Sequence, residues 1–514
     1  MHTTPLATRP PNRVPVEFRA EVDSQLAAEV AKGWLYPLPP QLKPLAAMLP
    51  VAPLQVAVEP TKVRRITDYS NRSPRSGRRR GVNGQVSVCD LEPAVMHRSD
   101  DLARAVYGIP GALLLVRDMS KAFRRVAVRW RDVPWLLSSW SGTLLADLRL
   151  PFGHAASAHL VCKLTQAIAR QLTRRFQPLA RALVYVDDFV IVAHPSVSLA
   201  VQSVFETMMH DLGLPISAPK AAKTGGWSTR AEWIGFIHDA DTKTHSMPDG
   251  KREALLGEVR KAKRGIVPNG VSSLVGRLNH VASVFPAARA FLWGVRHWDR
   301  SGAATTPPRA ALADLEWWLR AIPRLPAVAG MKRAPCADDP VIATDASLWG
   351  IGGELVSHRG SRSPKGWRNT VPYSGTVRQR VRADLWPWAA PADMMTVEAA
   401  AALVAVRRWA PQFAHGRVWL QLDNEALVWA LTKGSSRHAA ANALIRELLL
   451  VCTSYDLQVF PYHVASECNA GPDLLSRWGQ TLARPVGWEV DVLPPCHWAD
   501  MARRGQELSP ATSL

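Results

Sequence analysis

Two acidic residues lie side by side in the otherwise apolar stretch RALVYVDDFVIVA, residues 181–193. Successive side chains of a strand point to opposite faces, so adjacent acids inside a strand would force one charge into the core. A tight hairpin between ALVYV and FVIVA avoids this by placing Asp187 and Asp188 at its tip. Aspartate is common in purely structural turns, but VDDF lacks the Gly or Asn expected of a two-residue loop. The pair is therefore a candidate for chemistry.

A third carboxylate, Asp118, ends the apolar stretch GALLLVRD. If its strand neighbours the hairpin, three acids converge at one edge of a sheet, and their repulsion is unfavourable unless divalent cations neutralise it. Mg²⁺ is favoured, with Mn²⁺ as the alternative, because the ligands are hard oxygens without histidine. A two-metal site of this kind serves the transfer of a phosphoryl or nucleotidyl group.

Four further acids stand at the ends or beginnings of apolar elements in the last third of the chain: Asp345, Glu398, Asp423 and Asp473. A single acid in such a place is commonly a helix cap, and Asp473 after Pro472 fits that alternative. The surrounding elements follow the order strand, strand, helix, strand, helix. Four acids in this order are harder to explain as separate caps.

The composition restricts the partners of the chain. Its 514 residues are 47% hydrophobic, and 63 Lys and Arg against 43 Asp and Glu leave a net charge of +20. The resulting field attracts polyanions, so nucleic acid is the first partner to expect and an acidic membrane surface the second. No apolar run is long enough to span a bilayer and no secretion signal begins the chain, which predicts an intracellular protein, cytoplasmic or nuclear. Six scattered cysteines without C-x-x-C spacing argue against zinc and disulfides.

The elements that must position the acids can be outlined from their patterns. Apolar spacing predicts helices over 18–37 and 156–176, and alternation predicts a strand, turn and strand over 53–72. The basic segment 73–84 is either a solvated loop or a phosphate contact. Further along lie a basic helical stretch from 251 to about 335, a Pro-rich linker around 321–340 and a mixed α/β domain of about 140 residues.

These stretches resemble the ordered motifs of reverse transcriptases. YVDD (185–188) is similar to the Tyr-x-Asp-Asp motif of that family, and RDMSKAFRRV (117–126) to its preceding aspartate motif. The other matching stretches are TKVRRITDYSNRS (61–73), LPFGHAASAHLVCKL (150–164), GLPISAPK (213–220) and WIGFIHD (233–239). Each motif alone is short; their order and spacing carry the resemblance.

The resemblance implies a role for each matching position. Asp118 and Asp187 would hold both metal ions, and Asp188 would complete the cluster. Lys220 would donate a proton to pyrophosphate, although a surface lysine, or Lys223 nearby, is the alternative. The residues implied at the incoming nucleotide are Arg64 and Lys62 at the triphosphate, Phe123 against a 2′-hydroxyl, and Phe152 and Gly153 lining the nucleotide and template pocket. His154 and Ala155 depart from the family's Leu-Pro-x-Gly segment.

The second set of acids resembles the Asp-Glu-Asp-Asp set of the ribonuclease H fold. That resemblance implies two more Mg²⁺ ions bridged by Asp345 and Asp423, with Glu398 and Asp473 completing the site. His463 matches a histidine that assists product release, but a lone histidine beside a strand is as readily structural. Asn469 and the LLSR tail strengthen the match, whereas Pro472 replaces the alanine common there.

Together these resemblances predict a multidomain α+β and α/β protein: a right-hand polymerase with fingers, palm and thumb, then a helical connection and a ribonuclease H-like mixed α/β domain. The expected boundaries are a disordered N-terminus at 1–17, fingers and palm at 18–245, thumb and connection at 246–337, the ribonuclease H-like domain at 338–480 and a C-terminal tail at 481–514.

The implied function is that of a retrotransposon reverse transcriptase with ribonuclease H, similar to the DIRS-type or pararetrovirus-like group. Its implied partners are an RNA template, a DNA primer, the RNA–DNA hybrid and dNTPs, with no membrane. One alternative is a domesticated, catalytically inactive derivative that binds nucleic acid. Another is a polymerase of a telomerase-like or non-LTR class.

Overall fold

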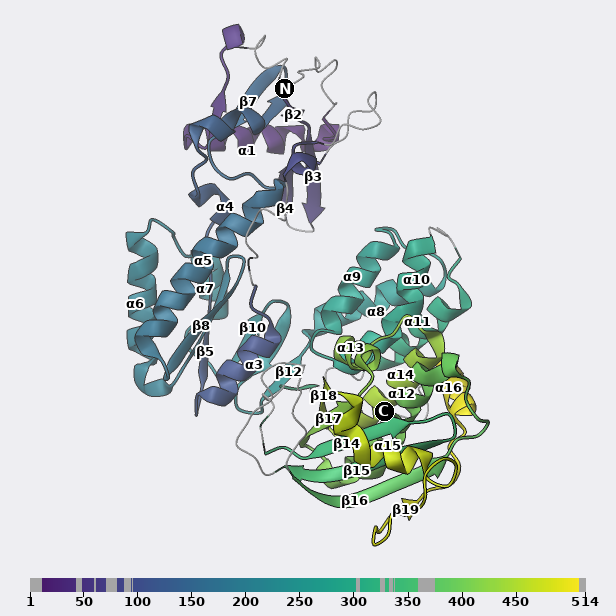
Figure 1. Ribbon diagram of the computed structural model, residues 1–514. Helices are drawn as coiled ribbons and strands as arrows, with labels where there is room; N and C mark the ends of the chain where they lie inside the picture. Colours follow the sequence, from purple (N-terminus) through teal and green to yellow (C-terminus); the bar gives the residue numbers. More distant parts are fainter. Residues whose placement is uncertain are drawn as a thin grey trace. The chain divides into compact units, whose positions relative to one another are not determined.

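The structure is a computed structural model (Figure 1), which describes residues 12–42, 49–59, 62–70, 81–86, 94, 96–301, 306–323, 329–331, 336, 338–358 and 375–507. The chain forms two compact units. The first comprises Met1–Ile234 with His238–Thr242, and the second Gly235–Ile237 with Lys243–Leu514. Most of the basic segment 73–84 and half of the Pro-rich segment 321–340 lie outside the described residues. Among those described, no helix has the length and apolarity needed to cross a membrane.

The core of the first unit is an antiparallel sheet in the order β5-β9-β8. Its strands are β5 (Leu113–Asp118), β8 (Ala180–Tyr185) and β9 (Asp188–Ala193). The helix α5 (Ala155–Phe176) lays an apolar stripe on this sheet, and α6 (Ser198–Asp211) packs beside it. Other elements around it are α3 (Ser99–Gly108), α4 (Ala122–Arg125), η6 (Pro195–Val197), α7 (Ala218–Thr224) and β10 (Arg230–Trp233).

A second sheet of this unit has the order β1-β7-β6-β2 and is accompanied by the hairpin β3–β4. The antiparallel pairing of β3 with β4 confirms the two strands predicted over 53–72, whereas residues 60–61 between them lie outside the described residues. Residues 12–17 were expected to be disordered, but Arg13 pairs with Gln55 of β3 and Val14 is buried. The bounds are η1 (Val16–Phe18), α1 (Arg19–Ala31), β1 (Leu35–Pro37), η2 (Pro40–Leu42), β2 (Val51–Ala52), β3 (Leu54–Glu59), β4 (Lys62–Thr67), η3 (Val82–Gln85), η5 (Trp130–Trp135), β6 (Leu137–Trp140) and β7 (Thr143–Asp147).

The second unit begins with a helical bundle whose core is rich in tryptophan. Trp298 and Trp318 are fully buried, and Trp317 stacks on Phe291 with ring centroids 3.9 Å apart. These tryptophans therefore serve packing. The elements are β11 (Phe236–Asp239), β12 (Thr244–Ser246), α8 (Asp249–Lys263), α9 (Val271–Val281), η7 (Pro286–Leu292), α10 (Trp293–Ser301), α11 (Arg309–Ala321) and β13 (Ala329–Gly330).

The rest of the second unit is built on a six-stranded sheet in the order β18-β17-β14-β15-β16-β19. Strands β14, β15 and β16 are antiparallel, whereas β14, β17 and β18 are parallel. The strands are β14 (Val341–Ala346), β15 (Gly350–His358), β16 (Gly375–Asp384), β17 (Arg417–Leu422), β18 (Gln458–His463) and β19 (Asp491–Val492). The helical elements are η8 (Pro391–Asp393), α12 (Met394–Trp409), η9 (Ala410–Phe413), α13 (Glu425–Lys433), α14 (Ala439–Ser454), η10 (Ser466–Asn469), α15 (Ala470–Arg477) and α16 (Trp498–Glu507).

Helices cover both faces of this sheet. Ile351 and Leu355 of β15 join the core formed with α12 and α14. Gly352 points to the opposite face, where a Cβ atom on it would lie 2.2 Å from the carbonyl oxygen of Pro472 in α15. The glycine therefore allows α15 to lie directly on the sheet.

The C-terminal segment expected as a tail is part of this domain. β19 adds to the edge of the sheet by pairing in parallel with Val381 and Arg382 of β16. Cys496, Met501 and Ala502 are buried in the same core as α12. Residues 481–507 therefore complete the fold, which sequence patterns did not predict because the strand has only two residues.

A buried ion pair joins the helical bundle to α14. Arg446 of α14 contacts Asp314 of α11, whose side chain is completely buried. The second oxygen of Asp314 accepts a hydrogen bond of 2.6 Å from the Gly294 amide, and Arg446 Nε donates to the Ala290 carbonyl at 3.2 Å. The bundle and the sheet domain thus share a polar network that is closed to water.

We expect Asp314→Ala to destabilise the protein by about 3–5 kcal/mol, because Arg446 would be left as a buried charge without its carboxylate. Urea unfolding followed by tryptophan fluorescence measures this change. The matched control is Arg503→Ala, which removes one partner of an exposed pair with Asp500 and should leave the transition unchanged. A parent-like transition for Asp314→Ala would show that the pair does not hold the bundle and the sheet domain together.

Candidate active sites

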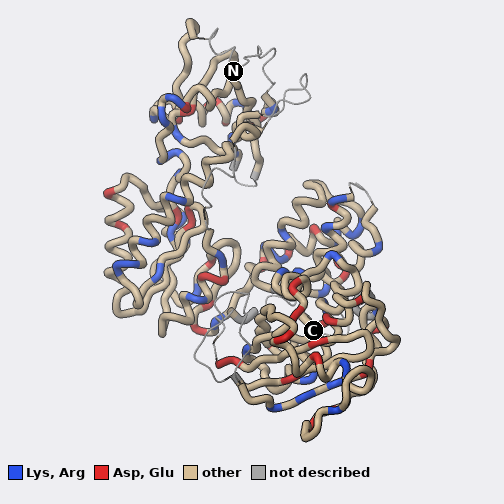
Figure 2. The backbone as a smooth tube through the Cα atoms, viewed as in Figure 1, with Lys and Arg blue, Asp and Glu red and all other residues tan. Residues whose placement is uncertain are grey.

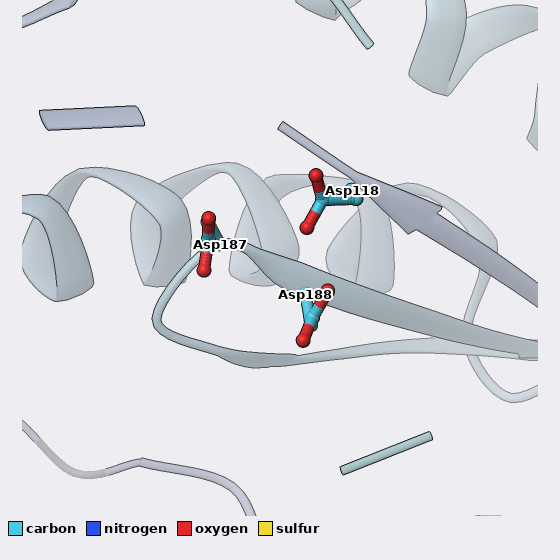
Figure 3. A group of neighbouring side chains, drawn as sticks. All are labelled: Asp118, Asp187 and Asp188. Carbon is cyan, nitrogen blue, oxygen red and sulfur yellow. The ribbon is translucent and has the colours of Figure 1, made fainter. Parts of the chain in front are cut away.

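The first acidic cluster is assembled by strand register. Asp118, the last residue of β5, pairs directly with Asp188, the first residue of β9. Asp187 precedes Asp188 in the hairpin loop between β8 and β9. One oxygen from each of the three carboxylates lies within 4.8 Å of the others (Figure 3). The expected convergence of these three acids is therefore observed.

The hairpin loop is shifted by one residue from the expected one. Tyr185 pairs with Asp188, so the two-residue loop is Val186–Asp187. Val186 has a φ of 57°, a left-handed conformation that is unfavourable for a β-branched residue. The Thr165 hydroxyl of α5 donates a hydrogen bond of 2.7 Å to the Val186 carbonyl. This contact offsets part of the backbone strain.

The backbone of the two acids is held from two other elements. The Met119 amide donates to the Asp187 carbonyl at 3.1 Å. The buried Trp233 of β10 donates its indole N–H to the Asp188 carbonyl at 3.0 Å. The carboxylates are therefore fixed by their own main chain, which is the arrangement needed to present them to a cation.

Lys220 of α7 lies at this cluster. Its Nζ is 2.5 Å from Asp118 Oδ1 and 3.8 Å from Asp188 Oδ1. Burial alone would lower the pKa of Lys220, but the contact with Asp118 raises it overall. The structure thus places the predicted lysine, as a charged ammonium, beside the carboxylates.

Burial is the main reason that the pKa values of two of these acids are raised. Burial and the charge of Asp118 raise the pKa of Asp187. Burial and the hydrogen bond with Asp118 raise the pKa of Asp188 to about 7. A cation among the three would relieve this cost, so their donor set fits Mg²⁺.

Three residues expected at the incoming nucleotide lie together. The rings of Phe123 and Phe152 are 4.6 Å apart. Gly153 has a φ of +93°, and a Cβ on it would lie 2.3 Å from the Thr67 carbonyl oxygen, so this position requires glycine. Arg64 is exposed on β4, and its charge opposes part of the rise that burial causes in the pKa of Asp187. The side chain of Lys62 lies outside the described residues.

A buried polar network lies behind Phe123 and was not predicted from the sequence. The adjacent Arg124 contacts Asp147 of β7 and donates to Glu29 of α1 at 2.6 Å. The Tyr69 hydroxyl donates to the second Asp147 oxygen at 2.9 Å. This network fixes α4, and the only signal for it was an acid ending the apolar strand TLLAD.

The second acidic cluster lies where β14, β17 and α12 meet. Asp345 on β14 and Asp423 just after β17 lie at the same level because these strands are parallel and in register. Glu398 of α12 joins them, and one oxygen from each of the three acids lies within 4.8 Å of the others. Among the residues that the structure describes, none offers a hydrogen bond to the buried Glu398 Oε2. An unpartnered carboxylate oxygen among hard oxygen donors fits a divalent cation.

Asp473 lies near this group but outside it. Its Oδ1 accepts a hydrogen bond of 2.7 Å from Arg477 Nε. Burial is the main cause that raises the pKa of Asp345 to about 7 and the pKa of Glu398 well above its ordinary value, and the charge of Asp473 contributes to both. The structure therefore brings three of the four predicted acids into contact range and leaves the fourth ion-paired beside them.

Hydrogen bonds orient the acids of this second cluster. The Ser476 hydroxyl donates to Asp345 Oδ2 at 2.7 Å, and the Ser466 hydroxyl to Asp423 Oδ2 at 2.9 Å. His463 Nε2 donates to the Asp423 carbonyl at 3.1 Å, so this histidine holds the main chain of an acid. Neither serine was predicted from the sequence. Ser476 lies in the LLSR stretch that contributes to the resemblance, whereas no sequence pattern indicated Ser466.

No family model and no curated protein matches the chain. A solved structure of the foamy viral protease-reverse transcriptase dRH in complex with double-stranded DNA is similar, with a TM-score of 0.51 and 13% identity over 89% of this chain and 72% of that chain. The foamy viral protease-reverse transcriptase in complex with an RNA/DNA hybrid gives a TM-score of 0.49 and 12% identity over 95% and 58% of the two chains.

The chain therefore has the fold of a right-hand polymerase followed by a helical connection and a ribonuclease H-like mixed α/β domain, as predicted. At 13% identity, this structural similarity establishes the fold of the chain alone.

The raised pKa of Asp345 predicts a pH-dependent cost. Below about pH 4 the carboxyl is protonated in the folded and unfolded chain alike, so it costs nothing. As the pH rises to about 7 the unfolded chain ionises first, and the folded chain loses stability until the penalty is complete. Without divalent ions, Asp345→Asn should therefore unfold at a higher temperature than the parent at pH 8, and the gap should narrow towards pH 4.

Calorimetry in EDTA across this pH range tests the expectation. The control is Asp249→Asn, at a carboxylate that is 80% exposed, and it should change the unfolding temperature far less than Asp345→Asn does. An Asp345→Asn protein less stable than the parent at pH 8 would mean that the acid is satisfied by its present neighbours.

Proposed function

We propose that the protein is an RNA-directed DNA polymerase of a retroelement with a fused ribonuclease H that degrades the RNA strand of RNA–DNA hybrids. The observation that carries this proposal is the presence, in one chain of this fold, of two separate carboxylate clusters, each on its own sheet. The net charge of +20 favours a polyanionic substrate for both.

In the polymerase site, Asp118 and Asp187 would hold two Mg²⁺ ions, or Mn²⁺, and Asp188 would complete the set. When bound, such ions activate an attacking hydroxyl and stabilise the leaving pyrophosphate. Lys220 carries a proton beside these acids and is the candidate donor to the leaving group. The Thr165 and Trp233 hydrogen bonds keep the acids in place while substrates enter and leave.

The nucleotide would be selected by the residues next to this site. Arg64, with Lys62, would bind the triphosphate of the incoming dNTP through charge-assisted hydrogen bonds. Phe123, packed on Phe152 and backed by the Arg124 network, would exclude a 2′-hydroxyl by contact. Gly153 would leave room for the nucleotide and template.

In the ribonuclease H site, Asp345 and Asp423 would bridge a second pair of Mg²⁺ ions, with Glu398 and Asp473 as further ligands. Bound ions there would activate water for attack on the phosphodiester. Glu398 Oε2 offers the one buried acceptor of this cluster without a partner in the described chain. His463 holds the Asp423 main chain and would assist product release only after leaving that contact.

The two activities act on one substrate, since copying RNA leaves a hybrid whose RNA must be removed. The proposed domains are fingers and palm at 18–245, thumb and connection at 246–337 and ribonuclease H at 338–480, to which the fold adds the C-terminal segment. An RNA template, a DNA primer, the hybrid and dNTPs are the proposed partners, met in the cytoplasm or nucleus. Assignment to a DIRS-type or pararetrovirus-like element stays a prediction.

We expect the protein to extend oligo(dT) on poly(rA) with dTTP and Mg²⁺ or Mn²⁺. Asp187→Asn should reduce extension at least about 10³-fold, because several kcal/mol of charge stabilisation depend on the cluster. Asp423→Asn, in the other site, is the matched control. Extension that survives Asp187→Asn would refute the site assignment, and an inactive parent that still binds the primer–template would favour the non-catalytic derivative.

The nuclease prediction is reciprocal. A labelled RNA–DNA hybrid should be cut in its RNA strand by the parent and by Asp187→Asn, but not by Asp423→Asn. Denaturing gels of end-labelled RNA measure the cleavage, with the same sequence as duplex DNA for comparison. Equal cleavage by the parent and Asp423→Asn would place the nuclease centre elsewhere.

A further inference from the structure

Two exposed tryptophans stand on the loop between β16 and α12. Trp386 is 60% exposed and Trp388 is 62% exposed, whereas Leu385 and Ala389 on either side are buried in the core of the sheet domain. Large aromatic side chains in adjoining exposed positions are unfavourable in water, and they commonly mark an interaction surface. Nothing in the proposed chemistry uses this pair.

Main-chain hydrogen bonds hold the loop at three positions. The Leu385 amide donates to the Trp349 carbonyl at 2.7 Å, and the Ala389 amide donates to the Leu348 carbonyl at 2.9 Å. The Trp386 amide donates to the Cys496 carbonyl at 3.0 Å. These bonds fix the main chain that carries the tryptophans, so little conformational entropy would be lost on binding.

The C-terminal segment provides part of this support. Cys496 pairs with Leu385, and the Trp498 indole N–H donates to the Pro387 carbonyl at 2.8 Å. The segment from β19 to α16 therefore clamps the tryptophan loop. Residues 481–507 therefore support the tryptophan loop as well as the edge of the sheet.

The loop lies at the end of the sheet that bears the second acidic cluster. Gly350 pairs with Asp384, the residue before the loop, and Asp345 pairs with Gly352 on the same strand β15. The loop then leads into α12, which carries Glu398. β16 is two strands from β14, or about 10 Å. That distance corresponds to about three nucleotides along a duplex strand.

Arginines on β16, the strand that leads into the loop, contact other tryptophans. Arg382 lies over Trp478 at 4.9 Å, and Arg484 contacts the same ring at 5.2 Å. Arg380 lies over Trp488 at 3.9 Å. Figure 2 shows basic residues recurring along β16. These arginines are themselves ion-paired, Arg380 with the buried Glu354 at 2.9 Å and Arg382 with Asp384. Asp393 accepts a hydrogen bond from the Ala390 amide.

We propose that Trp386 and Trp388 form a binding subsite for the nucleic-acid strand that passes the Asp345–Glu398–Asp423 cluster. The rings would stack on bases or sugar faces a few nucleotides from the cluster. The proposal rests on the proposed function for the identity of the substrate as an RNA–DNA hybrid. A nucleic-acid strand fits because the loop lies at the end of the sheet that carries the acidic cluster, and because exposed aromatic faces suit the faces of bases.

Equilibrium binding of a fluorescein-labelled RNA–DNA hybrid to the full chain in EDTA, without turnover, tests this subsite. The double variant Trp386→Ala/Trp388→Ala should bind the hybrid at least about tenfold more weakly, since base stacking on an aromatic ring commonly contributes that much. Trp386→Phe/Trp388→Phe should restore most of the affinity, because phenylalanine keeps a stacking face. Trp130→Ala, at a tryptophan 80% exposed in the first unit, is the matched control and should bind like the parent.

Hybrid cleavage gives a second readout. If the rings bind the ground state and transition state alike, the alanine pair raises KM and leaves kcat unchanged. Thermal unfolding confirms that the variants are folded. Affinity within twofold of the parent would overturn the proposal, and a loss of self-association by light scattering with unchanged affinity would assign the rings to a second copy instead. A parent that binds the hybrid but does not cut it would refute the proposed nuclease while leaving the subsite in place.

Discussion

The organising constraint of this molecule is the repulsion among carboxylates that the fold forces together. Asp187 and Asp188, at the end of the β8–β9 hairpin, lie beside Asp118 at the end of β5. In the second unit, Glu398 of α12 lies beside Asp345 and Asp423 at the end of the sheet. Burial withholds from these groups the water that would screen their charges, and the pKa values of most of them rise in consequence. Such clusters lower stability, so a folded chain retains them where a cation can be captured.

Main-chain geometry, more than side-chain packing, maintains the repulsive arrangement. At the first cluster the register of β5 with β9 sets the spacing, and Thr165 holds Val186 in a conformation that valine avoids. At the second, the parallel pairing of β14 with β17 sets the spacing, and the Ser476 hydroxyl orients one acid. In both places strand pairing sets the distance between the acids. A hydrogen bond from a neighbouring helix then holds the chain or side chain of one acid in position.

Features that depend on local pattern could be predicted from the sequence. The strand that ends at Asp118 and the hairpin around Asp187 follow from apolar runs interrupted by acids, and the convergence of these acids follows from the resulting sheet. Features that depend on distant partners could not. Ser476 meets Asp345 across 131 positions, and Asp314 meets Arg446 across 132, with no pattern that links them.

Very short elements and the exposure of individual side chains also could not be predicted from the sequence. The two-residue β19 has no periodicity to detect, so the C-terminal segment could only be expected as a tail. Tryptophans buried in the bundle cannot be told by sequence from Trp386 and Trp388 on the surface, because burial depends on which neighbours the fold brings to them. The hairpin loop shifted by one residue because Val186 accepts a left-handed conformation that its residue type alone would exclude.

The ion pair between α11 and α14 has an evolutionary consequence. A recombination crossover near residue 338 would appear, from the sequence, to move the sheet domain as a separate module. Such an exchange would separate Arg446 from Asp314 and introduce a foreign helix against the bundle. The bundle and the sheet domain should therefore be inherited together, and a lineage that acquires a new sheet domain should also carry the bundle that belongs to it.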